Sequence, residues 1–144
     1  LHSPSHVSLE SALAFHGWIP EAVYQVSSVT VARSRTFSTP LGVFGFRRVP
    51  AFAPRAGVEA VAIARDGWAF IASPLRAIAD MVYLRRNVTW SRDGLAYLTE
   101  GLRVEQDDLS ALSFDAADEI LEAVRSRRVR EYIRGLKGAV YHAA

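Results

Sequence analysis

The dipeptide Ser73-Pro74 divides the chain into two parts whose hydrophobic residues repeat with different periods. Serine caps a first helical turn and proline suits the first helical position, so a helix is expected to begin here. Residues 22–72 are rich in β-branched residues that partly alternate with polar ones, whereas the following apolar residues recur at helical spacing. With another helix expected over 7–17, the chain is predicted to be α+β. We expect a small, mostly antiparallel sheet of about four to five strands, packed with an N-terminal helix and C-terminal helices.

The strand-rich part contains two predicted units. Residues 22–49 are predicted to form two or three antiparallel strands, in which Phe37, Phe44 and Phe46 are candidate core residues. The strongest hairpin signal lies at 58–72, because two apolar runs flank Arg65-Asp66-Gly67 and Asp-Gly favours a tight turn.

Helix boundaries are predicted from capping residues. Ser8 and Gly17 are expected to begin and end the first helix. In the C-terminal part the expected N-caps are Ser91, Asp115 and Ser126. The gap of five residues between Val124 and Val129 breaks the apolar stripe, so two helices are expected there instead of one.

Composition excludes several classes of protein. A chain of 144 residues is long enough for one domain with a buried core. It has no cysteine, which excludes disulfides, thiol catalysis and thiolate metal sites. No apolar run approaches the roughly 18 residues of a membrane span, and the first residues do not resemble a signal peptide. We therefore expect a cytoplasmic protein.

Candidate catalytic groups are few, and neither a cofactor nor a metal is expected. His2 and His6 belong to a segment expected to be frayed, and His142 is close to the last residue. His16 is interpreted as a partner of the helix C-terminus or a half-buried aromatic. Asp80, among apolar residues of a predicted helix, has two interpretations: a functional acid with a raised pKa, or a structural carboxylate bonded to backbone or arginine.

The basic residues are the better lead to function. They comprise sixteen arginines and one lysine, with a net charge of +2, and arginine presents a fork that suits phosphate and carboxylate groups. Six of them fall within thirteen positions near the C-terminus. Such a cluster is either a solvated helical face or a surface for phosphate or an acidic partner. The candidate nucleic-acid or partner-binding residues are Arg33, Arg35, Arg47, Arg48, Arg125, Arg127, Arg128, Arg130, Arg134 and Lys137.

Three segments together resemble one known family. VSLESALAFHGWIPEAVYQV at 7–26 resembles the opening of the C-terminal domain of AbiEi-type antitoxins, with its serine-capped helix, aromatic and glycine, and following strand. RTFSTPLGVFGFRRV at 35–49 is similar to the hairpin of that family. IASPLRAIADMVYLR at 71–85 is similar to its strand-to-helix passage, although Leu75-Arg76 replaces the usual acid and lysine. The likeness covers about the first 86 residues.

The resemblance implies the repressor half of a bacterial abortive-infection toxin–antitoxin pair that acts against phage. It implies an upstream winged helix-turn-helix, expected to be missing from this chain, which binds the promoter of its own operon. This domain would then have no catalytic residues, would assist repression, and would neutralise a nucleotidyltransferase-type toxin. Two alternatives stay open: a metal-dependent nucleic-acid-processing enzyme that uses Asp80, and a plain protein-interaction module.

Overall fold

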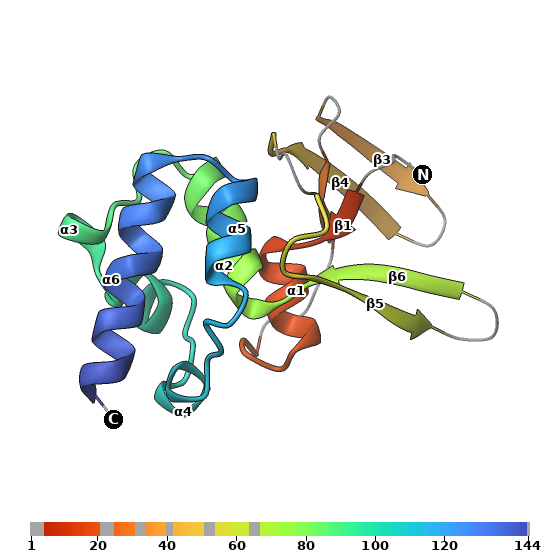
Figure 1. The fold of residues 1–144 in the computed structure, drawn as a ribbon. Coiled ribbons are helices and arrows are strands. Elements are labelled where there is room, and N and C mark those ends of the chain that lie inside the picture. The colour runs from red at the N-terminus through yellow and green to blue at the C-terminus, as the bar shows by residue number, and fades with distance from the viewer. Residues whose placement is uncertain are drawn as a thin grey trace.

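The computed structural model describes residues 5–20, 25–30, 34–39, 42–50, 54–63 and 67–143. Helices α2 to α6 gather on one side of the molecule and the strands fan out on the other (Figure 1). This arrangement confirms the predicted α+β class. In chain order the elements are β1 (Ser5–Val7), α1 (Leu9–Phe15), β2 (Gln25–Thr30), β3 (Arg35–Thr39), β4 (Gly42–Arg48), β5 (Val58–Ile63), β6 (Gly67–Ala72), α2 (Pro74–Leu84), α3 (Trp90–Asp93), the π-helix η1 (Tyr97–Gly101), α4 (Gln106–Ser110), α5 (Ala117–Ala123) and α6 (Arg127–Ala143).

The described strands form one mixed sheet of six, in the order β3-β4-β2-β1-β6-β5. Three pairings are antiparallel (β1–β2, β3–β4 and β5–β6), while β2–β4 and β1–β6 are parallel. The predicted hairpin is confirmed as β5–β6, in which Ile63 pairs with Gly67. Arg65 and Asp66 of its turn lie outside the described residues.

Two features of the sheet differ from the sequence-based expectation. Strand β2 does not continue an antiparallel series, because β3 takes the edge and β2 pairs with β4 in parallel. Strand β1 falls in the segment expected to be frayed, and its three residues are too short for a recognisable alternation. Of the three candidate core phenylalanines, Phe46 is buried; the side chains of Phe37 and Phe44 lie outside the described residues.

Helix α2 lies at the centre of the helical layer. Every residue from Leu75 to Val82 is buried, because α1, α5, α6 and β6 all contact this helix. The predicted start is confirmed: the Ser73 hydroxyl accepts a hydrogen bond from the backbone N–H of Arg76 at 3.2 Å, and Pro74 is the first helical residue. A helix enclosed on all sides is hydrophobic all round, so Arg76 and Asp80 are notable exceptions within it.

The break between the last two helices is also confirmed. Helix α5 ends at Ala123, and α6 begins after Ser126, whose hydroxyl accepts from the backbone N–H of Val129 at 3.3 Å. Gly17 follows α1 with a φ of +75°, the left-handed conformation in which helices commonly end. The two predicted apolar stripes are buried: Ile120, Leu121, Val124, Val129, Tyr132, Ile133 and Leu136.

Two predicted caps are wrong, and a third is only partly right. Ser8 does stand at the N-cap position of α1, but its hydroxyl makes no capping bond and donates instead to Asp80. Thr89, not Ser91, caps α3. Helix α5 begins two residues after Asp115 without a side-chain cap. Capping motifs are local signals, and here the Ser8 side chain is oriented toward the buried Asp80 carboxylate, to which it donates, so its oxygen does not accept from the free N–H groups of the first turn of α1.

None of the helices in the described part of the chain combines the length and the apolar character that crossing a membrane requires.

Candidate functional site

The Asp80 carboxylate, on the central helix α2, is fully buried and bonded through both oxygens. Arg76, one turn earlier, donates from Nε to Oδ1 at 3.0 Å. The Ser8 hydroxyl donates to Oδ2 at 2.6 Å, and Nε2 of His6 lies 2.9 Å from the same oxygen. Arg76 also donates to the Ala56 carbonyl at 2.8 Å. These bonds join β1, α2 and the segment before β5.

The pKa of Asp80 is lowered, not raised. Burial by itself would raise the pKa, but the Arg76 charge and the hydrogen bonds from His6 and Ser8 outweigh it. The interpretation of Asp80 as an acid with a raised pKa is therefore wrong, and that of a structural carboxylate bonded to arginine is confirmed. His6 is likewise not frayed, since it is a buried residue of β1.

Of the three other histidines, the structure describes the side chain of His16. His16 is half-buried, as expected: its Nε2 lies 2.8 Å from the Ala72 carbonyl oxygen and its ring meets the Phe15 ring edge-on. His2 and the side chain of His142 lie outside the described residues. Within the described ranges, no three histidine, aspartate or glutamate side chains come close enough to hold a metal ion.

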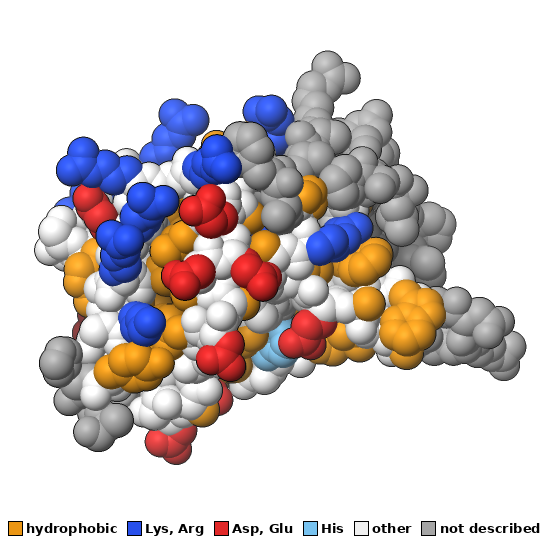
Figure 2. Space-filling view, viewed as in Figure 1, with side chains coloured by type: hydrophobic (Ala, Val, Ile, Leu, Met, Phe, Trp, Pro, Cys, Tyr) orange, Lys and Arg blue, Asp and Glu red, His pale blue; other side chains and the backbone are white. Residues whose placement is uncertain are grey.

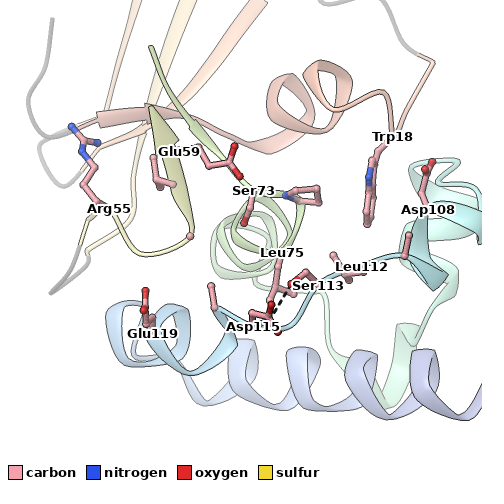
Figure 3. Close-up of a pocket in the computed structure, with 15 residues that line it drawn as sticks. Trp18, Arg55, Glu59, Ser73, Leu75, Asp108, Leu112, Ser113, Asp115 and Glu119 are labelled. Carbon is pink, nitrogen blue, oxygen red and sulfur yellow. Dashed lines mark hydrogen bonds between the residues drawn. The ribbon is translucent and has the colours of Figure 1, made fainter. Parts of the chain in front are cut away.

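A groove of about 540 Å³ opens between the start of α2, strand β5 and the chain before α5. Its carboxylates come from separate elements and are spread around the rim, as Figure 3 shows for Glu59, Asp108, Asp115 and Glu119. Trp18 lines one end, and Ser113 bonds the backbone N–H of Asp115. Because these acids do not converge on one point, the groove offers a negatively charged surface without a paired-acid geometry for catalysis.

Four of the basic residues of α6 share a surface. Arg127, Arg130, Arg134 and Lys137 are all exposed, and their spacing of three, four and three residues places them on one side of the helix. We call these four residues the α6 basic face. They span about 15 Å at the helical rise of 1.5 Å per residue. Figure 2 shows this concentration of basic side chains along α6, beside acidic side chains over α5.

The α6 basic face continues into an open groove at the junction with α5. Arg125, Arg127, Arg130 and Arg134 line this groove, together with the acids Glu122 and Glu131. Arg127 pairs with Glu131 at 3.2 Å and Arg125 with Glu122 at 3.8 Å, in both cases between exposed side chains. Exposed pairs of this kind contribute little free energy, so an incoming anion can take the place of the glutamate beside each arginine at small cost. The positive charge predominates along the groove.

Arg128 belongs to the same sequence cluster but points into the protein. Its guanidinium donates to the Val82 carbonyl, to that of Tyr83 at 3.1 Å, and to those of Arg85 and Val88 at 3.2 and 3.0 Å. These acceptors lie at and just beyond the end of α2, where carbonyl groups lack partners within the helix. Arg128 thus provides hydrogen-bond donors for the carbonyl groups at the end of the central helix, and it is not on the α6 basic face.

Of the predicted basic residues in the strand-rich part, the structure describes the side chains of Arg47 and Arg48. Arg47 and Arg48 are exposed on β4, but consecutive strand residues point to opposite sides of a sheet. Arg33 lies outside the described residues, and of Arg35 only the backbone, in β3, is described. The structure brings together one of the predicted clusters, that of α6, on a single described surface.

No protein-family model, curated protein or solved structure matches this chain. The arrangement of its own residues therefore carries the functional argument, beside the resemblance of the three segments.

Sequence analysis missed one exposed feature, on the hairpin β5–β6. Trp68 and Phe70 are 68% and 40% exposed, although large aromatic side chains are usually buried. The signal is visible in WAFIA at 68–72, where two aromatic residues two positions apart lie on one side of a strand. The pattern by itself does not say which side of the strand faces the core.

Proposed function

We propose that this chain is a regulatory domain of the AbiEi antitoxin type, which binds the backbone of operator DNA through the α6 basic face. The observation that carries the DNA contact is the alignment of four exposed cations, Arg127, Arg130, Arg134 and Lys137, along one side of a helix. Phosphate contacts of this kind position a protein on DNA and carry no sequence information. The domain would therefore assist a separate sequence-reading domain upstream.

The resemblance to the antitoxin family supplies the second part of the proposal, neutralisation of a nucleotidyltransferase-type toxin. The residues of IASPLRAIADMVYLR have clear physical roles: Ser73 caps α2, Pro74 starts it, and Arg76 pairs with Asp80 one turn later. Arg76 stands at the lysine position of the family pattern and keeps a positive charge beside Asp80.

Salt-dependent DNA binding tests the role of the α6 basic face. Fluorescence anisotropy with a labelled duplex should show affinity that falls steeply with salt, since each phosphate contact contributes a slope of about −0.9 on a log–log plot. Replacing Arg130 and Arg134 together by glutamine should reduce the slope by about two. The matched control is Arg92→Gln, an exposed arginine of α3 away from this face; its slope should stay unchanged.

A wild-type chain without measurable salt-dependent binding would leave a protein-interaction module as the better interpretation. An equal slope in the wild type and the double variant would also contradict a DNA contact through α6.

The neutralising role has a separate test. Co-expression of the chain with the nucleotidyltransferase-type protein encoded beside it should restore bacterial growth that this protein inhibits when expressed alone. If no such gene lies in the same operon, or if growth is not restored, the antitoxin assignment is wrong.

A further inference from the structure

The solvent side of the β5–β6 hairpin carries an open aromatic surface. Trp68 pairs across the two strands with Ala62, and Phe70 with Ala60, so these four residues share one side of the hairpin. All four are exposed. The alanines are too small to cover the rings, which leaves the Trp68 ring in particular open to solvent. On the other side, Ile71 is buried and Val61 and Ala69 pack against the core.

An arginine completes this surface. The guanidinium of Arg55 lies 3.7 Å from the centre of the Phe70 ring, a cation–π contact. Its Nη1 also donates to the Ser5 carbonyl oxygen at 2.6 Å, which holds the group beside the ring while the residue stays exposed. We call Trp68, Phe70 and Arg55 the aromatic platform. Figure 2 shows apolar side chains exposed at this hairpin, with a basic side chain next to them.

The size and charge of the aromatic platform indicate its ligand. At 68% and 40% exposure, the two rings offer roughly 250 Å² in total, since a large aromatic residue buries at most about 250 Å². A stable protein dimer needs about 800 Å² from each partner, so the rings are too small to hold a second copy. A flat, uncharged ring with a phosphate beside it fits both the area and the positive charge of Arg55.

We propose that the aromatic platform binds unpaired bases of single-stranded nucleic acid. A base stacks on the open face of Trp68, and Arg55, held against Phe70, meets the neighbouring phosphate. Exposed aromatic residues on strands bind single strands in this manner, because an unpaired base offers its whole face. Duplex DNA keeps its base faces stacked inside the helix, so this site is separate from the α6 basic face.

Tryptophan fluorescence gives a direct measurement. Trp68 is the most exposed of the three tryptophans, because Trp18 is buried and Trp90 is half-buried. Titration of the chain with an oligothymidylate of about twelve nucleotides should quench its emission. Trp68→Leu keeps an apolar side chain but removes the ring, and it should bind about tenfold or more weakly. Because this variant lacks the reporting tryptophan, its affinity is measured by the fluorescence anisotropy of a labelled oligothymidylate. Trp68→Phe keeps a ring and should retain most of the affinity.

Two controls separate stacking from general attraction. Phe15→Ala removes another exposed aromatic residue, on α1, and should bind the oligonucleotide like the wild type. An abasic strand of the same length has the phosphates without the bases, and wild-type protein should bind it as weakly as Trp68→Leu binds the oligothymidylate.

Three outcomes would overturn the proposal: wild-type affinity in Trp68→Leu, equal affinity for the abasic strand, or a change in oligomeric state in Trp68→Leu without a change in nucleic-acid binding. The last outcome would identify the hairpin as a protein-docking surface. In the variant with Arg130 and Arg134 replaced by glutamine, adding Trp68→Leu should still lower the affinity for the oligothymidylate. Failure of the α6 proposal and failure of this one are thus distinguishable.

Discussion

The buried ion pair of Arg76 and Asp80 is the most consequential residue-level feature of the helical core. Both side chains are essentially inaccessible to solvent, 1% and 0% exposed, and transferring two charges out of water is costly. The cost is offset by further partners, because the Ser8 hydroxyl and the Ala56 carbonyl satisfy the remaining groups. In the described part of the chain, no buried side-chain nitrogen or oxygen lacks a partner.

Asp80→Ala should lower the free energy of unfolding by about 3–5 kcal/mol, because it leaves the Arg76 guanidinium buried without a counter-charge. Urea denaturation followed by circular dichroism would measure the loss. The double variant Arg76→Met/Asp80→Leu removes both charges and should be clearly more stable than Asp80→Ala. If the double variant is as unstable as Asp80→Ala, the unpaired charge is not the cause.

Acid should destabilise the protein through the same carboxyl. The pKa of Asp80 is lower in the folded protein than in the unfolded chain, where an aspartate titrates near about 4. Its contribution to stability is therefore complete above pH of about 4 and is lost as the pH falls through the lower folded value. Urea unfolding at a series of pH values should show the free energy of unfolding of the wild type falling as the pH is lowered below about 4. The fall should be smaller in Asp80→Asn.

Arg128 and Arg130, two positions apart, are predicted to separate stability from binding. Arg128→Ala should cost about 2 kcal/mol of unfolding free energy, because it leaves the carbonyls at the end of α2 without their charged donor. Arg130→Ala removes an exposed side chain and should change stability by less than about 0.5 kcal/mol. Salt-dependent DNA binding should show the reverse order, and similar stabilities for the two variants would contradict the inward position of Arg128.

At the level of elements, the helix starts show when a capping residue can be predicted from its neighbours in the sequence. Ser73 and Ser126 cap helices as predicted, because their hydroxyls meet a free N–H within the next turn. Ser8 also directly precedes a helix, but its hydroxyl bonds Asp80, 72 positions away. A cap prediction holds where no distant partner competes for the hydroxyl, and no local pattern reveals such a partner.

The glycines of α6 should respond in opposite ways to alanine. A Cβ at Gly135 would lie 2.3 Å from the Trp90 ring, so Gly135→Ala should lower the free energy of unfolding by about 1–3 kcal/mol. A Cβ at Gly138 would meet nothing within 4 Å, and Gly138→Ala should stabilise the helix by about 0.5–1 kcal/mol. Thermal unfolding of both variants would measure the two shifts; stabilisation by both would contradict the close packing of α3 on α6.

At the level of the whole molecule, one core joins the sheet to the helices. The buried cluster extends from Leu9 in α1 through Val29 and Ile71 of the sheet to Val140 in α6. The bonds of His6 and Ser8 to Asp80 add a polar connection between β1 and α2. The strands and helices are therefore expected to be stable only together.

Unfolding should accordingly be a single cooperative transition. Amide hydrogen exchange in β2 and in α6 should report the same free energy of opening, and urea curves from fluorescence and circular dichroism should coincide. Two separate transitions, with the sheet lost first, would contradict a common core.

The distribution of exposed charge is also a property of the whole molecule. The acids of α5 and the cations of α6 lie next to each other (Figure 2), so the exposed charge is separated although the net charge is only +2. Net charge by itself would not have indicated a binding surface. The separation arises because α5 and α6 meet at Ser126 and each turns its apolar stripe to the same core.

The sequence by itself determined the α+β class, the β5–β6 hairpin, the start of α2 and the break before α6, because each depends on neighbouring residues and on hydrophobic period. Only the tertiary structure decided the parallel pairing of β2 with β4, the burial of His6, and which arginines face solvent. Arg128 and Arg130 have the same chemistry in the sequence. Their different positions depend on the packing of α6 against the end of α2, a contact between residues more than forty positions apart.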